Sequence, residues 1–424
     1  MVVEELAPAG GIEAALVTLA AALRPLGVES VVLSCQPLTS DNQYVRQLKE
    51  AGVPLHHLPP ALWHARDRVD RLRTAGAVIL LLAALPLTAV VVFGLAGLRR
   101  WPPGRSLHSM IGQLRRWMPA RTLARLVWAA YVRGWCWRQR IELIHVHGYG
   151  CGATPGWAMY AAARTGQPVV YSEHGIPWPA LRTAPEIGRE LNGARRIIAV
   201  SQAAARATRE VCGAAAPVDV IYHVVEGAAE KRAPRAADGP LVFGCAGMLR
   251  PPKGHIHWIE SMPEVLRQAP ECRFVVAGDG SERDMLQAAA QRLGVRPRVE
   301  FLGHVPNADL RAVLRGWDVF VLPSLEEPLG IVVVEAMAAG LAIVATAAGG
   351  VLDLVRDAET ALLVKPGDSA ALAAAQVRLA QDPDLRQRLG QAARAAYEAG
   401  PFSAAAVGRA TLACYEAALR DTAG

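Results

Sequence analysis

Cysteine is scarce in this sequence and is never paired in a metal-binding spacing. The seven cysteines are odd in number and scattered along the chain, and no two of them form a CxxC pair. This pattern gives no indication of a zinc or thiol redox site, and a reducing compartment is the simplest interpretation. We therefore expect the body of the protein to lie in the cytoplasm.

Acidic residues are absent from 71–141, where twelve arginines and half of the ten tryptophans gather. All the excess of basic over acidic residues, which gives the net charge of +7, therefore comes from this one segment. Positive charge confined in this way argues against a nucleic-acid partner. Arginine mixed with tryptophan is typical of a membrane interface, where indole rings lie at headgroup depth and cations meet anionic lipid.

Charge of either sign is absent from residues 75–98, AGAVILLLAALPLTAVVVFGLAGL, a run long enough to cross a bilayer. Its position excludes a secretory signal. Strand-like runs at 30–35 and 141–148 flank it, and a single crossing would put parts of one sheet on opposite sides of the membrane. We therefore favour a re-entrant hairpin kinked at Pro86, followed by basic surface helices; a spanning helix and a buried helical insert are the alternatives.

The rest of the chain alternates short apolar strands with helices, which predicts an α/β protein with doubly wound parallel sheets. With 424 residues, 52% of them hydrophobic, it can form two or three domains. An Ala- and Pro-rich linker at 226–240 separates two predicted domains, 1–225 and 241–395. A predicted helix at 396–424 follows the second domain and can cross back to the first. Only a stub of the expected first strand precedes the first helix, so either the sheet tolerates a short strand or the true start lies upstream.

A carboxylate at Glu335 interrupts the apolar helical run of EEPLGIVVVEAMAAG, residues 326–340. Gly330 lets the backbone approach a ligand, and the first helical turn presents unpaired amides to a phosphate. Side chains of a helix lean toward its N-terminus, so Glu335 points back to the same spot. Burial without a hydrogen bond would be costly. Vicinal ribose hydroxyls fit this carboxylate, protein amides are the alternative partner, and Glu327 can hold the hydroxyls of a second sugar.

Glu327 and Glu335, with seven residues between them, resemble the E-x7-E signature of the retaining glycosyltransferases of family 4, or group 1, which have the GT-B fold. The resemblance extends in order through PAGGIEAALVTLAAAL, VHGYG, VVYSEHG, AVSQA, GMLRPPKG, AGDGSERDML and FLGHVPNADL. It implies two Rossmann-like, doubly wound parallel-sheet domains that face a cleft, with the acceptor on the side of 1–225 and the nucleotide sugar bound by 241–395. The insertion at 71–141 would associate the first domain with a membrane.

The resemblance also implies a role for each matching residue. Glu335 would bind the donor ribose, Glu327 the transferred sugar and Lys253 the diphosphate. Met248 stands where the family commonly has arginine, and Arg250 is the substitute. His174 would lie near the anomeric centre. The remaining donor contacts would come from loop residues Gly303, Val305, Gly330 and Ile331, and Gly10 and Gly11 would let the backbone approach the donor phosphates or the acceptor.

No protein nucleophile is apparent, and retention in this family is usually explained by front-face attack, in which the leaving diphosphate accepts the acceptor's proton. Catalysis then rests on positioning and charge stabilisation, without a metal or cofactor beyond a UDP- or GDP-linked donor. Asp382 and Asp384 form a DxD pattern, but its place before a helix indicates a turn and cap.

These expectations converge on a metal-independent glycosyltransferase that acts on a lipid-linked or envelope-polysaccharide acceptor. It would be peripheral or re-entrant at the cytoplasmic face of the inner membrane. A GT-B nucleotide-sugar epimerase is the second enzymatic interpretation, and the presence of both Glu327 and Glu335 argues against it. A non-catalytic membrane scaffold is the alternative from another class.

Overall fold

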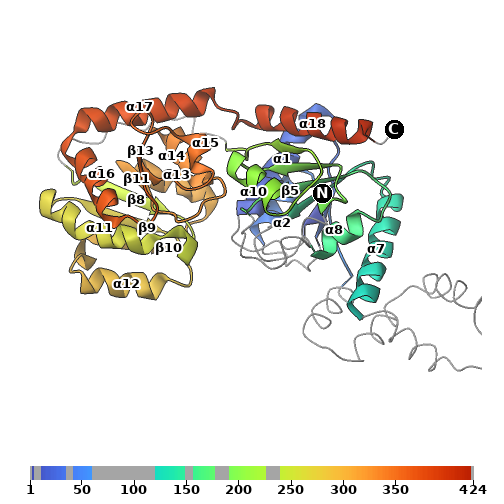
Figure 1. The fold of residues 1–424 in the computed structure, drawn as a ribbon, viewed down its shortest axis with the longest axis horizontal. Helices are drawn as coiled ribbons and strands as arrows, with labels where there is room; N and C mark the ends of the chain where they lie inside the picture. Colours follow the sequence, from blue (N-terminus) through green and yellow to red (C-terminus); the bar gives the residue numbers. More distant parts are fainter. Residues whose placement is uncertain are drawn as a thin grey trace, which may run out of the picture. The chain divides into compact units, whose positions relative to one another are not determined.

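The computed structural model describes residues 2–3, 11–34, 42–59, 120–148, 156–176, 191–225 and 239–421. The chain forms two compact units (Figure 1). The first unit comprises Met1–Ile198, Thr208–Asp219 and Leu412–Gly424, and the second comprises Ala199–Ala207 and Val220–Thr411. The end of the chain thus belongs to the first unit. Most of the predicted linker, and residues 60–119 of the region around the predicted insertion, lie outside the described residues.

The first unit is built on a seven-stranded sheet of order β3-β2-β1-β4-β5-β6-β7, in which β1 to β5 pair in parallel. Its strands are β1 (Val2–Val3), β2 (Val32–Ser34), β3 (Leu55–His57), β4 (Ile144–Gly148), β5 (Val169–Glu173), β6 (Arg196–Ala199) and β7 (Val218–Val220). Its helices are α1 (Gly11–Leu23), η1 (Arg24–Leu26), α2 (Gln43–Glu50), α7 (Ala120–Arg138), α8 (Gly156–Ala162) and α10 (Gln202–Glu210), whose first turns join the second unit.

Helix α7 is part of the core of the first unit. Trp128 is 1% exposed and Trp135 is 8% exposed, and both pack with residues of α8, β4 and β5. These two tryptophans are core residues, which corrects their assignment to a membrane interface. Trp137, at the end of the same helix, is 79% exposed. The helical period of α7 therefore separates the tryptophans of this segment by burial.

The second unit has a six-stranded parallel sheet of order β10-β9-β8-β11-β12-β13. Its strands are β8 (Val242–Ala246), β9 (Arg273–Ala277), β10 (Val299–Gly303), β11 (Val319–Leu322), β12 (Ala342–Thr346) and β13 (Leu362–Val364). Its helices are η2 (Pro251–Lys253), α11 (His255–Gln268), α12 (Arg283–Arg292), η3 (Arg296–Arg298), α13 (Asn307–Arg315), α14 (Ile331–Ala339), α15 (Val351–Leu354), α16 (Ser369–Gln381) and α17 (Pro383–Ala399). The last helix, α18 (Ala404–Arg420), begins in this unit and ends in the first.

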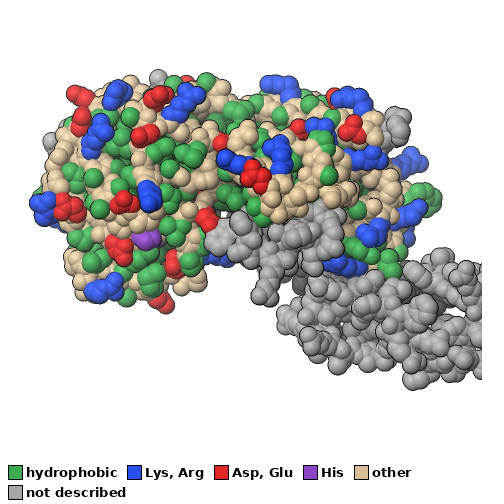
Figure 2. Space-filling model, in the orientation of Figure 1, with side chains coloured by type: hydrophobic (Ala, Val, Ile, Leu, Met, Phe, Trp, Pro, Cys, Tyr) green, Lys and Arg blue, Asp and Glu red, His purple; other side chains and the backbone are tan. Residues whose placement is uncertain are grey.

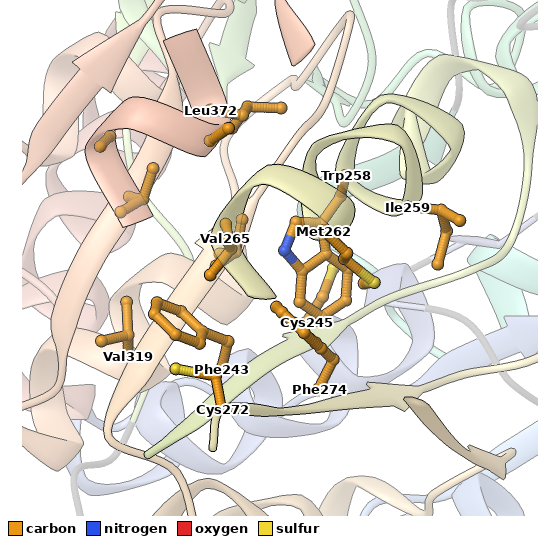
Figure 3. Packing of buried hydrophobic residues seen from close by; sticks show 14 of the residues in the cluster. Phe243, Cys245, Trp258, Ile259, Met262, Val265, Cys272, Phe274, Val319 and Leu372 are labelled. Carbon is orange, nitrogen blue, oxygen red and sulfur yellow. The ribbon is translucent and has the colours of Figure 1, made fainter. Parts of the chain in front are cut away.

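Three aromatic side chains pack among aliphatic ones in the core of the second unit. Phe243 of β8 stacks on Phe274 of β9, and Trp258 of α11 meets the edge of Phe274 (Figure 3). The Trp258 indole donates to Gln376 Oε1 at 2.8 Å, so the one polar atom of this buried ring is satisfied. This packing fixes β8 and β9 under α11, the helix that follows the predicted diphosphate loop.

Both sheets run outward from a central strand and then return to its other side, which defines a doubly wound topology with a switch point. The switch lies between β1 and β4 in the first unit and between β8 and β11 in the second. Loops that follow these strand pairs are where ligands bind in such sheets. The predicted doubly wound parallel sheets are therefore confirmed.

The structure identifies no membrane-crossing helix among the residues it describes. The apolar run 75–98 lies outside those residues. On the face of the second unit that Figure 2 shows, acidic and basic side chains are interspersed. The described surface of this unit therefore presents mixed charge on that face.

Gly244 in β8 should be intolerant of a side chain. A Cβ added there would lie 1.9 Å from Cδ2 of Trp317, which is 2% exposed. We expect Gly244→Ala to destabilise the second unit by about 1–3 kcal/mol through overpacking, measured by calorimetry.

Gly134→Ala in α7 is the control, because a Cβ there meets nothing within 4 Å. It should stabilise the first unit by about 0.5–1 kcal/mol. An unchanged transition of the second unit in Gly244→Ala would contradict the packing described here.

Candidate active site

Two loops meet at the switch point of the second unit and are tied together through their backbones. The carbonyl of Pro252, in η2, accepts from the amides of Leu325 at 2.9 Å and Glu326 at 3.1 Å. Gly254 has φ +60°, and a Cβ there would lie 2.3 Å from the carbonyl oxygen of Pro323. Only glycine allows this approach, so the glycine after Lys253 is what brings the loop after β8 against the loop after β11.

Lys253 and Glu327 form an ion pair across these two loops. The Lys253 ammonium donates to Glu327 Oε1 at 2.9 Å and to Oε2 at 2.7 Å. The Lys253 side chain is 24% exposed and the Glu327 side chain 7%. Residues predicted to bind two parts of one donor therefore also contact each other.

Further hydrogen bonds hold the Glu327 carboxylate and its loop in place. Ser324 donates its hydroxyl to Glu327 Oε2 at 3.0 Å, and the carbonyl of Ser324 accepts from the Thr346 hydroxyl at 2.5 Å. The carbonyl of Glu327 accepts from the amide of Gly350 at 2.8 Å. The carboxylate is therefore positioned by β12 and its following turn as well as by Lys253.

The Lys253–Glu327 pair retains capacity for a ligand. An ammonium has three donors and an ionised carboxylate about four acceptor positions. Two donors of Lys253 and three acceptor positions of Glu327 are occupied by the contacts above. One N–H of Lys253 can then reach a phosphate oxygen, and one lone pair of Glu327 can accept a sugar hydroxyl. Because the pair is neutral overall, further positive charge for a diphosphate must come from other groups.

The N-terminus of α14 supplies part of that charge. Gly330 begins the helix with φ +91°, and a Cβ there would lie 3.2 Å from Val333 Cγ2 and 3.3 Å from Glu327 Cγ. Val333 and Val334 turn their amides back to the carbonyl of Gly330. The first two amides of the helix, those of Ile331 and Val332, have no carbonyl within the helix to donate to, which makes this terminus favourable for an anion.

Glu335 is a half-buried carboxylate in the second turn of α14. Burial raises its pKa from 4.5 to about 7, and the charge of Arg311 opposes the shift. Within the part of the chain that the structure describes, Glu335 makes no hydrogen bond. The alternative partner considered from the sequence, a set of protein amides, is therefore not found among the described residues, and the carboxylate keeps its full capacity for hydroxyl donors.

Arg250, Gly303 and Val305 line the same edge of the sheet. Arg250 is exposed at the start of η2. Gly303 ends β10 with φ +74°, and its carbonyl accepts from the amide of Gly278 at 2.8 Å, while Val305 is half-exposed two residues on. A Cβ on Gly278 would lie 1.9 Å from the carbonyl oxygen of Gly247. The loops after β8, β9 and β10 are therefore held backbone against backbone.

His255 is a residue of this region that the sequence patterns did not single out. It is 3% exposed, and neither ring nitrogen has a hydrogen-bond partner among the described residues. Burial, followed by the charge of Lys253, lowers its pKa to about 4, so the imidazole is neutral near pH 7. The one feature of the sequence that could have pointed to His255 is its position directly after the Lys253–Gly254 turn.

The remaining predicted residues belong to the first unit. His174 follows β5, is 6% exposed, and its Nε2 lies 3.0 Å from Nδ1 of His147. Gly11 begins α1, and Gly10 lies outside the described residues. In the second unit Asp382 caps α17, accepting from the amide of Leu385 at 2.9 Å. The DxD pattern thus includes a helix cap, as the sequence predicts.

Comparison with known proteins places this geometry in a family context. The model of glycosyl transferases group 1 matches residues 228–396, and that of glycosyltransferase family 4 matches residues 88–227. The 2-deoxystreptamine glucosyltransferase of Streptomyces kanamyceticus is 31% identical over 291 residues, which are 67% of this chain and 70% of the relative. The D-inositol 3-phosphate glycosyltransferase of Streptomyces scabiei is 31% identical over 315 residues, 66% of this chain and 69% of the relative.

A solved structure shares the fold over nearly the whole chain. The crystal structure of Anabaena HepE, in complex with UDP and glucose, has a TM-score of 0.70 at 21% identity and covers 98% of both chains. The predicted GT-B fold is thereby confirmed, with one doubly wound parallel sheet in each unit.

Removing Lys253 should destabilise the second unit. Lys253→Ala leaves the buried carboxylate of Glu327 without its cation, and we expect a loss of about 3 kcal/mol in the free energy of unfolding, at the low end for a broken buried pair because Lys253 is partly exposed. Urea unfolding measures it.

The double variant Lys253→Ala/Glu327→Gln should recover part of that loss, because no buried charge then remains. Glu327→Gln alone completes the cycle. Additive effects of the two substitutions would show that the two side chains are not coupled.

Stability of the second unit should fall as pH rises from about 4.5 to about 7 and level off above that. Glu335 titrates near pH 7 in the folded chain and near 4.5 when unfolded, so between these values the folded state binds more protons. Because one pKa unit corresponds to about 1.4 kcal/mol, the loss between pH 4.5 and pH 8 is about 3 kcal/mol.

Glu335→Gln should remove this decline and be more stable than the natural chain at pH 8, measured by urea unfolding. Glu264→Gln on α11 is the matched control, since Arg267 beside it lowers the pKa of Glu264 to about 2, below the window. A decline that persists in Glu335→Gln would assign it to another group.

Proposed function

Because the chain belongs to the family 4, or group 1, glycosyltransferases, we propose that it is a retaining transferase that moves a sugar from a UDP- or GDP-linked donor to a lipid-linked or envelope-polysaccharide acceptor at the cytoplasmic face of the inner membrane. Its glycosyltransferase class follows from the family. The donor, the acceptor, the stereochemistry and the place of action are the proposal.

The observation that carries the proposal is the arrangement of charges around α14. Three features meet at the switch point, on two loops and one helix. They are the neutral Lys253–Glu327 pair, which has spare donor and acceptor capacity, the N-terminus of α14, and the Glu335 carboxylate, which makes no hydrogen bond among the described residues. A phosphate, a sugar hydroxyl and a diol are the three groups that this set complements. A sugar nucleotide contains all three, joined in one molecule.

Each group then has a role in holding the donor. Lys253, the first amides of α14 and the exposed Arg250 contact the diphosphate. Glu327 accepts from a hydroxyl of the transferred sugar, and Glu335 accepts from both ribose hydroxyls. Ionised Glu335 is the better acceptor, so donor binding releases a proton wherever the free carboxyl is protonated. Glycine backbones of the loops after β9 and β10, including Gly303, lie where the base is bound.

The transfer needs no group beyond the substrates to balance it. The bond between the anomeric carbon and the diphosphate oxygen breaks, the acceptor oxygen bonds to that carbon from the same face, and the acceptor's proton passes to the departing diphosphate. The chain holds the reactants and stabilises charge on the leaving group. His174 of the first unit is proposed to contact the transferred sugar or the leaving phosphate.

A UDP-linked sugar is the first donor to test, since HepE of Anabaena was crystallised with UDP and glucose. The names of the two curated relatives give polar cyclitol acceptors, 2-deoxystreptamine and D-inositol 3-phosphate. A soluble polyol acceptor is therefore the second candidate.

Membrane attachment rests on the composition of 71–141 and on the end of α7. There Trp137 is 79% exposed, and Arg133, Arg138 and Arg140 are exposed beside it in the sequence. An exposed indole among guanidinium groups complements an anionic lipid surface. This local surface supports placing the acceptor in or on the membrane.

The test is nucleotide release by the detergent-solubilised full chain. UDP-, GDP- and ADP-sugars are supplied with a metal chelator and with a bacterial lipid extract, 2-deoxystreptamine or D-inositol 3-phosphate as acceptor. We expect release from one donor that depends on lipid, a product with the donor's anomeric configuration by NMR, and a loss of about 100-fold or more in Glu335→Ala and Lys253→Ala.

The exposed variants Glu264→Ala and Lys49→Ala should keep full activity as matched controls. Release that depends on a soluble polyol would favour the second candidate. No release from any donor would point to the scaffold, and release indifferent to both site substitutions would refute the assigned donor site.

A further inference from the structure

Four polar side chains lie on one face of two neighbouring strands in the first unit. Side chains alternate along a strand, so His145 and His147 of β4 share a face, and Ser172 of β5 and His174 just beyond it face them. The opposite face, with Val146 and Tyr171, packs in the core with α7 and α8. All four polar residues are at most 6% exposed.

The C-terminal helix closes this polar face. Tyr415 of α18 is 7% exposed, and its hydroxyl lies 2.7 Å from His145 Nδ1, although 270 residues separate them. The second ring nitrogen, Nε2, lies 2.7 Å from the hydroxyl of Ser172. Both nitrogens of His145 are therefore engaged. Burial holds the pKa of His145 well below its usual range, so the ring is neutral with one donor and one acceptor.

The fixed ring of His145 constrains the ring of His147, because the two pack against each other. Its ring lies on that of His147 with 4.0 Å between centroids and 32° between planes. His147 Nδ1 in turn lies 3.0 Å from His174 Nε2. One proton must lie between these two nitrogens for that contact to be a hydrogen bond, so the tautomers of His147 and His174 are coupled. The sequence of contacts runs from Tyr415 through His145 and His147 to His174.

We propose that Tyr415 is a positioning residue for sugar transfer, because its hydroxyl fixes His145 and thereby the orientation and tautomer in which His174 meets the donor. The inference rests on the proposed function through the role given there to His174. Tyr415 touches no substrate in this scheme. Its hydroxyl hydrogen-bonds to one nitrogen of His145, and loss of that bond leaves a buried polar atom that the ring must turn to satisfy.

The groups that face the histidine array come from three elements. β4 contributes the two histidines, and α18 contributes Tyr415, whose pKa burial raises, so that the phenol keeps its proton. From β5 comes Ser172. Glu173, also on β5, is turned to the amide of Gly175 at 2.8 Å and to the hydroxyl of Tyr171 at 3.5 Å.

The test compares Tyr415→Phe with the natural chain in two measurements. Tyr415→Phe keeps the ring, which meets His145 edge to face, and removes only the hydroxyl. Nitrogen-15 spectra of labelled histidines should show a changed tautomer ratio or pKa for His174. The kcat of transfer should fall about tenfold with KM for the donor unchanged, and the pH profile of kcat should shift with the His174 signal.

Tyr397→Phe is the matched control, because Tyr397 on α17 also donates one hydroxyl bond, to the carbonyl of Val225 at 2.9 Å. It should leave the His174 signals and the pH profile unchanged. In the His174→Ala background, Tyr415→Phe should cause no further loss of kcat, whereas a merely structural role would add its loss there too.

An unchanged His174 spectrum in Tyr415→Phe overturns the inference whatever the kinetics show. A changed spectrum with natural kcat and pH profile overturns it as well. Absence of transfer by the natural chain with every donor would instead be a failure of the proposed function, and it is distinguishable because the spectra require no turnover.

Discussion

The ion pair of Lys253 with Glu327 joins the two loops on which the second unit's ligand chemistry depends. It can form because β8 and β11 are neighbours at the switch point, where the chain leaves on one side of the sheet and returns on the other. Gly254 and Gly330 allow the close approach, and Ser324, Thr346 and Gly350 hold the carboxylate in register. Helix α14 begins beside this neutral ion pair. Because the pair has no net charge to offset that of an anionic ligand, the first amides of α14 are needed for the anion, and Glu335 stays available to hydroxyl donors.

The two units share one topology and use it differently. In the second unit the strands are apolar and the polar groups lie on loops at the carboxyl edge, which suits a donor with separated phosphate, sugar and ribose groups. In the first unit a face of β4 and β5 is itself polar, and a tyrosine from the far end of the chain covers it. Burying polar groups of this kind is costly without hydrogen-bond partners, and Tyr415 and Ser172 supply them for His145. The last nine residues of α18, 412–420, belong to the first unit, and Tyr415 among them supplies a hydrogen-bond partner for His145.

Much of the fold could be predicted from local pattern. Strands such as 242–246 and 319–322 are short apolar runs, and helices such as 255–268 have helical periodicity, so neighbours in sequence suffice to define them. The tryptophans of 71–141 show the limit of composition. Trp128, Trp135 and Trp137 look alike in the sequence, but two are in the core and one is exposed, because burial depends on the side of α7 that α8 and the sheet cover.

The sequence by itself determined the α/β alternation, the family, and which residue types are available for the donor, since E-x7-E and the lysine loop are local spacings. Tertiary structure alone decided that Lys253 binds Glu327, 74 residues away, that Glu335 lacks a partner among the described residues, and that Tyr415 meets His145. The physical reason is that hydrogen bonds and desolvation depend on distances of a few ångströms in space. Strand order fixes those distances, and no spacing along the chain encodes them.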